Sequence, residues 1–147
     1  MKRIITNITG GLLLAVCIVL TLLSVVSCGQ QAADRDIAVA DSLSEAAPQR
    51  AMTLIDSLEG ESAMNKSRHM KLLLLKAKVR NKLAMPMSTD SLKDIADYFD
   101  KNGDSNERML AYYILGSAYF DGKDAPMALQ YFHEAAAKAD TTDSSCD

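Results

Sequence analysis

The stretch that most constrains the fold is residues 112–132, YYILGSAYFDGKDAPMALQYF. Its first half reads as a helix with Gly116 inside it and apolar residues around nearly the whole circumference. A glycine within a helix costs about 1 kcal/mol of stability relative to alanine. A helix that is apolar on all sides either packs between neighbouring helices or exposes an apolar surface that can bind another molecule. Both features predict close packing, with the small residues Gly116 and Ala128 where two helices cross.

The spacing of the aromatic and small residues around Gly116 resembles the tetratricopeptide repeat. That repeat has an aromatic residue, Leu-Gly and Tyr at fixed spacing in its first helix, then Ala and Phe in its second. Within residues 109–142, the matching positions are Tyr112, Leu115, Gly116, Tyr119, Ala128, Phe132 and Ala135. Tyr112 stands where tryptophan is usual, and Asp140 where the terminal proline is usual. The alternative is an ordinary helical hairpin with an incidental glycine.

Helical patterns separated by short breaks fill the rest of the chain, and no stretch shows sustained strand alternation. We expect helices over residues 37–46, 48–58, 65–84, 89–100, 104–120 and 125–139. Proline suits the first turn at 48, and Asp104 with Glu107 resembles a capping box. The fold is therefore predicted to be all-α. The resemblance implies antiparallel helix pairs in a short right-handed superhelical array over residues 37–147, with degenerate pairs over 48–100.

The apolar positions of the upstream helices predict which faces are buried. For the helix over 48–58 they are Ala51, Met52, Leu54, Ile55 and Leu58, and for 89–100 they are Leu92, Ile95, Ala96 and Phe99. For the helix over 65–84 we expect a single apolar side, formed by Met70, Leu73, Leu74, Ala77 and Leu83. The Lys and Arg residues between 71 and 82 predict a solvated face, the alternatives being contact with lipid headgroups or with an acidic partner.

The first 27 residues have the composition of an export signal. Lys2 and Arg3 precede an apolar run over residues 11–26, and no further charge occurs before Asp34. A basic start and a long apolar middle are typical of a cleaved signal peptide. The alternative is an uncleaved membrane helix, since residues 4–27 are long enough to span a bilayer.

The segment VVSCGQ, residues 25–30, resembles the lipobox of bacterial lipoproteins. The resemblance implies cleavage before Cys28, acylation of Cys28 and a lipidated tether over residues 28–36. Several acyl chains anchor a protein stably without a spanning helix. Gly29 stands where aspartate would resemble an inner-membrane retention signal, so the resemblance favours an outer-membrane anchor. The next residues, QQAAD, lack the acidic cluster of some surface-exported lipoproteins, which favours the periplasmic face over the surface-exposed alternative.

Charge and cysteine usage exclude several functional classes. Removal of residues 1–27 leaves 14 basic and 19 acidic side chains, a net charge of −5, which gives no electrostatic reason to bind nucleic acid. After Cys17 and Cys28, only Cys146 remains, so no internal disulfide is possible. Its thiol is either free or paired with something beyond this chain.

We find no pattern of catalytic or metal-ligating residues. His69 and His133 are far apart, and Asp94, Asp97 and Asp100 read as an exposed helix face. The segment DTTDSSCD, residues 140–147, lacks the glycine and the terminal glutamate of a calcium loop. We therefore predict no metal, no cofactor and no enzymatic activity.

The resemblance to tetratricopeptide repeats, and to tetratricopeptide lipoproteins of Bacteroidetes, implies a function in binding. In that family the first helix of each pair lines a concave groove for a protein or peptide partner. The matching groove positions here are Leu110, Tyr113, Ser117, Phe120 and Asp121. Tyr113 and Phe120 are the strongest candidates, the alternative being that they pack against a neighbouring repeat. Two other roles remain open: the N-terminal sensor portion of a longer signalling regulator, and a component of an outer-membrane nutrient-uptake complex.

Overall fold

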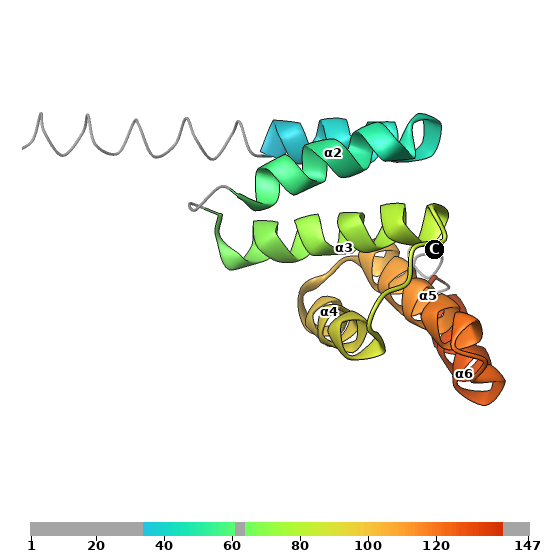
Figure 1. Cartoon of the computed structure of the whole chain (residues 1–147). Coiled ribbons are helices and arrows are strands. Elements are labelled where there is room, and N and C mark those ends of the chain that lie inside the picture. The colour runs from blue at the N-terminus through green and yellow to red at the C-terminus, as the bar shows by residue number, and fades with distance from the viewer. Residues whose placement is uncertain (1–33, 61–63, 140–147) are drawn as a thin grey trace, which may run out of the picture. The chain divides into compact units, whose positions relative to one another are not determined.

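The part of the chain described by the computed structural model, residues 34–60 and 64–139, consists of α-helices joined by short connections. Residues 34–46 are helical, and five helices follow: α2 (Pro48–Glu59), α3 (Lys66–Lys82), α4 (Thr89–Asn102), α5 (Ser105–Asp121) and α6 (Ala125–Ala139) (Figure 1). No strand occurs among these described residues, which confirms the all-α prediction. The predicted signal, Cys28, residues 28–33 of the tether, residues 140–142 of the expected repeat and Cys146 lie outside them.

The helix ends mostly follow the signals in the sequence. Pro48 occupies the first turn of α2, where the N–H that proline lacks would have no partner. The Asn65 side chain accepts the backbone N–H of Arg68 (2.9 Å) and starts α3. The Asp104 and Glu107 side chains form the predicted reciprocal capping box at the start of α5. Ser88 immediately precedes α4, but its side chain makes no capping hydrogen bond.

Helix α3 is buried on two sides. The predicted side is confirmed for Met70, Leu73, Leu74 and Ala77, but Leu83 packs against a second cluster that the sequence did not predict. Leu74 and Ala77 face one cluster of buried residues, whereas Leu72, Leu75 and Val79 face another. The sequence reasoning missed this second set because it assumed a surface helix with one apolar stripe. The four consecutive leucines 72–75 instead point around the helix, as a helix between two layers requires.

The two clusters divide the packed unit that begins at Asp36. The N-terminal cluster joins the 34–46 helix, α2 and α3 through Ala40, Ala51, Ile55, Leu58, Leu72, Leu75 and Val79. The C-terminal cluster joins α3 to α4, α5 and α6 through Leu74, Ala77, Leu92, Ile95, Ala96, Phe99, Ala111, Tyr112, Ile114, Leu115 and Ala135. The predicted buried residues of α4 are all among them.

The helices are not uniformly antiparallel to their sequence neighbours. Figure 1 shows α2 and α3 side by side and seen from the side, whereas α4 is seen almost end-on and therefore crosses α3 steeply. Helix α5 packs against both α3 and α4, and α6 packs chiefly against α5. Ala84, in the connection between α3 and α4, has a left-handed backbone (φ 52°), which redirects the chain there.

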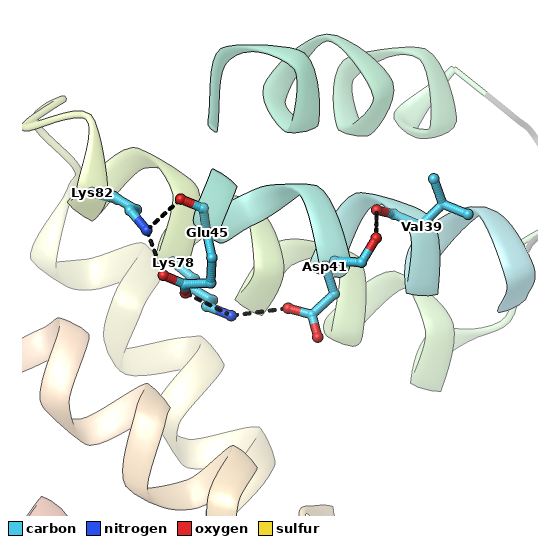
Figure 2. A network of polar contacts seen from close by, with 6 residues as sticks. Val39, Asp41, Glu45, Lys78 and Lys82 are labelled. Carbon is cyan, nitrogen blue, oxygen red and sulfur yellow. Dashed lines mark hydrogen bonds and ion pairs between the residues drawn. The ribbon is translucent and has the colours of Figure 1, made fainter. Parts of the chain in front are cut away.

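The basic run of α3 is bound to acidic residues of this same chain. Lys78 lies 3.0 Å from Asp41 and 3.4 Å from Glu45, and Lys82 pairs with Glu45, as Figure 2 shows. On the α2 side, Lys76 bridges Asp56 (3.0 Å) and Glu59 (2.6 Å). The prediction of a merely solvated face was therefore wrong for these three lysines. They connect α3 to the helices before it.

Candidate functional site

The α5–α6 hairpin is built around the close approach at Gly116. A Cβ atom at this position would lie 2.8 Å from Cδ1 of Phe132 and 3.3 Å from the backbone oxygen of Ala128. Ala128 and Ala135 are buried on the opposing helix. Small residues let the two helices approach closely here, because a larger side chain at Gly116 would displace the Phe132 ring.

Aromatic rings flank this crossing on two sides. Toward α4, the Tyr119 and Tyr131 rings stack at 5.3 Å, and Tyr112 lies 6.2 Å from Tyr131. Burial, with the nearby charge of Asp100, raises the pKa of Tyr112 to about 12. On the other side, the Tyr113 ring lies 5.7 Å from Phe132. The hairpin is thus held by ring contacts along both edges.

The predicted groove residues fall into three environments. Tyr113 is 47% exposed and Phe120 is 62% exposed, whereas Ser117 between them is half-buried and donates its hydroxyl to the Tyr113 carbonyl (3.1 Å). Leu110 is half-buried against the C-terminal cluster. Asp121 is exposed at the end of α5. We call Tyr113, Ser117 and Phe120 the aromatic stripe.

Asp121 also borders a cleft that sequence reasoning missed. The cleft has a volume of about 430 Å³ and lies between the end of α5, the start of α4 and the connection that follows α3. We call it the methionine cleft, because Met85 and Met87 line it and Met85 is 41% exposed. Ser117 and Asp121 are one turn apart on α5, so the aromatic stripe and this cleft are neighbours. The only signal in the sequence was the MPM segment at residues 85–87.

A second cleft, of about 550 Å³, runs between α3 and α4. His69, Met70, Leu73 and Arg80 line it from α3, and Asp94 lines it from α4. Arg80 is held by a hydrogen bond from Nη2 to the Pro86 carbonyl (2.7 Å). Asp94 and Asp97 are exposed as expected, but Asp100 is half-buried and paired with Lys138 of α6, which corrects the prediction of one exposed acidic face.

Neither histidine belongs to a metal-ligand cluster: the described ranges contain no group of three or more His, Cys, Asp or Glu side chains that could hold a metal ion. Across residues 34–60 and 64–139, no helix has the length and apolar character needed to cross a bilayer. Comparison of the chain with protein-family models, with curated protein sequences and with solved structures gives no match.

Proposed function

We propose that this chain is a lipid-anchored, non-catalytic protein-binding module whose α5–α6 hairpin is a tetratricopeptide-type pair. The observation that carries the proposal is the aromatic stripe beside the methionine cleft. Two large rings, Tyr113 and Phe120, are left 47% and 62% exposed on the same edge of one helix. Large aromatic side chains offer much contact area for little loss of side-chain entropy, and they dominate many protein interfaces.

The methionine cleft supports the same role. Methionine is unbranched and polarisable, so a surface formed by Met85 and Met87 adapts to the shape of a partner. Asp121 at its border supplies a charge that can orient a basic or hydrogen-bonding group of the partner. A partner segment lying along α5 would therefore place apolar side chains on the stripe and in the cleft.

The proposed repeat type rests on the hairpin geometry and on the resemblance in sequence. The signature glycine lies against the signature Phe132, and Ala128 and Ala135 are the buried small residues of α6. The stripe residues correspond to the groove positions of the family's first helix. These agreements support the assignment of the α5–α6 hairpin.

The lipid anchor at Cys28 would hold the module at a membrane, which we propose to be the periplasmic face of the outer membrane. Anchoring raises the effective concentration of the module near membrane partners without adding any contact. Radiolabelled fatty acid should enter the wild-type chain and should not enter a Cys28→Ser variant. Equal labelling of both chains would contradict this part of the proposal.

Site-specific photo-crosslinking tests the binding surface. A photoreactive phenylalanine analogue at position 113 or 120 should give discrete adducts with partner proteins in intact membranes, and the same analogue at Val39 should not. Val39 is a matched control because it is also an exposed apolar residue (43%) but lies on the 34–46 helix. The Tyr113→Ala/Phe120→Ala double variant should recover the same partners at least about tenfold less efficiently, a loss equivalent to one strong contact.

Adducts that form equally from all three positions, or recovery unchanged by the double variant, would contradict the assignment of the stripe. Circular dichroism of each variant shows whether the fold is intact. Because the two changed side chains are largely exposed, we expect little change in helix content.

A further inference from the structure

The cleft between α3 and α4, here called the α3–α4 cleft, contains no residue of α5 and none of the aromatic stripe. Its volume of about 550 Å³ is within the range of roughly 300–1,000 Å³ that is typical of small-molecule sites. Met70 and Leu73 of α3 and Ile95 of α4 give it an apolar surface. All three pack in the C-terminal cluster, so this surface is part of the folded core and is formed before any ligand arrives.

Arg80 brings to this cleft a positive charge that the described residues do not neutralise. Its Nη2 donates to the Pro86 carbonyl (2.7 Å), and its Nε is buried without a hydrogen-bond partner. No carboxylate in residues 34–60 and 64–139 lies within 4.0 Å of its guanidinium. Lys76, which lines the same cleft, differs because it bridges Asp56 and Glu59. A half-buried guanidinium with one carbonyl partner is incompletely satisfied, and its planar fork fits a carboxylate.

Asp94 brings the opposite charge from the α4 side of the same cleft. It is exposed, and in the described part of the chain no basic side chain lies within 4.0 Å of its carboxylate. Ser91, one turn before it, and Ser88 add hydroxyl groups to this side. The Ser88 hydroxyl makes no capping hydrogen bond to α4. The cleft thus has an apolar surface with a cation on one side and a carboxylate on the other, and these two do not pair with each other.

We infer that the α3–α4 cleft binds a free α-amino acid with an apolar side chain. The carboxylate of the amino acid pairs with Arg80, its ammonium group pairs with Asp94, and its side chain lies on the apolar surface. Charge complementarity selects this class of ligand. A simple carboxylate would leave Asp94 facing a second negative charge, and a simple amine would leave Arg80 facing a second positive charge. A residue inside a protein chain has both groups in amide bonds, so it supplies neither charge.

Nuclear magnetic resonance of methionine methyl groups tests whether this cleft is occupied. The full chain, held in phospholipid nanodiscs and labelled with carbon-13 at the methionine methyl groups, is titrated with L-leucine. Met70 lines only the α3–α4 cleft, Met85 lines only the methionine cleft, and Met52 packs in the N-terminal cluster. We expect the Met70 resonance to shift until it saturates, whereas the Met85 and Met52 resonances stay unchanged.

Modified ligands test the two charges without any change to the protein. N-acetyl-L-leucine has no ammonium group, and L-leucinamide has no carboxylate. Each should bind at least about tenfold more weakly than L-leucine, because each loses a hydrogen bond between charged groups. The apolar side chain is the same in all three ligands, so the comparison isolates the charges.

Substitutions assign each charge to its residue. Arg80→Met and Asp94→Asn should each weaken L-leucine binding at least about tenfold. In Asp94→Asn, acetylation of the ligand amine should cost little further affinity, because the group that it pairs with is already gone. Arg50→Met and Asp97→Asn remove the same charges at exposed positions outside the cleft, so both should bind L-leucine as the wild type does.

The inference is overturned if the Met70 resonance does not saturate with L-leucine, or if all three methionines shift equally. Equal affinity for L-leucine and either modified ligand would also overturn it, because the cleft would then recognise only one of the two charges. The modified ligands decide the question even if Arg80→Met does not fold. The Tyr113→Ala/Phe120→Ala variant should bind L-leucine normally, so failure of this site and failure of the proposed function are distinguishable.

Discussion

The two halves of the described chain achieve helix packing by different physical means. The N-terminal cluster is aliphatic, and its edge is closed by ion pairs from Lys76, Lys78 and Lys82 to acidic residues of the preceding helices. The α5–α6 hairpin has a backbone close approach at Gly116 and rings that contact one another along both edges. The first half therefore adds ion pairs to the edge of an aliphatic core, whereas the second depends on the close fit of rings and backbone.

This difference has consequences for both stability and observation. Exposed ion pairs are weak and are screened by salt, whereas ring packing and a steric fit are insensitive to salt. All eight aromatic residues lie between Tyr98 and Phe132, and the chain has no tryptophan. Near-ultraviolet signals therefore report on the C-terminal half, whereas far-ultraviolet circular dichroism reports on the helices of both halves.

The largest expected effect comes from the two cores. Phe99→Ala removes a ring that is 1% exposed and should lower the free energy of unfolding by about 3–5 kcal/mol. Ile55→Ala, in the N-terminal cluster, should lower it by about 2–5 kcal/mol. Because α3 contributes to both clusters, we expect one urea transition in each variant, seen at the same midpoint by the near- and far-ultraviolet signals.

Different midpoints for the near- and far-ultraviolet signals would show that the two clusters unfold separately. If Ile55→Ala shifts only the far-ultraviolet transition, the N-terminal helices unfold alone and α3 does not couple the clusters. Ser57→Ala, at an exposed position of α2, serves as a control and should leave both signals unchanged within about 0.5 kcal/mol.

A smaller effect is expected from Gly116→Ala. The methyl group gains about 1 kcal/mol of helix propensity, but overpacking against Phe132 costs about 1–3 kcal/mol. We expect a net loss of stability of about 1 kcal/mol in urea denaturation. Gly60→Ala is the matched control in the N-terminal half, because its nearest neighbour to a new Cβ is 3.5 Å away.

Replacing the Phe132 ring with a smaller side chain should reduce the Gly116→Ala effect. In a Phe132→Leu background, the added methyl group should destabilise less than in the wild type, which a double-mutant cycle measures. Additive effects of the two substitutions would show that the fit between Gly116 and Phe132 does not limit the hairpin.

The ion pairs should give a still smaller effect. The Lys78→Met/Lys82→Met double variant should lose at most about 1 kcal/mol for each lysine at about 0.1 M salt, and the difference from wild type should shrink at about 1 M salt. Gly116→Ala should show no such salt dependence. Lys101→Met, an exposed lysine on α4, controls for the general effect of removing a charge. A salt-independent loss would mean that the lysine stems, not their charges, hold the helices together.

The sequence predicted the individual helices well because their signals are local. The capping box at Asp104, the proline at the start of α2 and the apolar face of α4 each depend on a few neighbouring residues. The central place of α3 could not be predicted in the same way. Its burial on two sides depends on which helices lie beside it, and the pairing of its lysines depends on Asp41 and Glu45, more than thirty residues away.

The candidate site was predicted only in part, because some of its features depend on one helix and others on contacts between helices. The placement of Tyr113 and Phe120 along one edge of α5 could be predicted, because residues seven apart share a helix face. The methionine cleft did not, because it forms where the α3–α4 connection meets the end of α5. The exposure of Leu129 was also missed. In a periodic pattern it reads as another core residue, and only the position of α6 at the edge of the packed unit leaves it uncovered.

The smallest expected effects on stability concern its pH dependence. Acid should destabilise the N-terminal half and alkali the C-terminal half. Hydrogen bonds from Lys82 and then Lys78 lower the pKa of Glu45 from its ordinary value of 4.5. The stability that Glu45 contributes is therefore present above pH 4.5 and is lost as the pH falls through its folded pKa. Acid should weaken attachment of the 34–46 helix, and Lys78→Met/Lys82→Met should remove this part of the acid dependence.

Alkali should act on the other half, through Tyr112. Burial raises its pKa from 10.0 to about 12, so the unfolded chain loses this proton first and stability falls as the pH rises from 10 toward 12. Because burial also raises the pKa of Tyr131, titration followed by tyrosinate absorbance should show one fewer late-ionising tyrosine in Tyr112→Phe than in the wild type. In the same variant the alkaline loss of helix content should be shallower, whereas the acid side should not change. If every tyrosine of the wild type ionised near pH 10, the Tyr112 ring would not be buried between α4 and α6. The proposed difference between a buried aromatic hairpin and a solvent-exposed set of ion pairs would then be wrong.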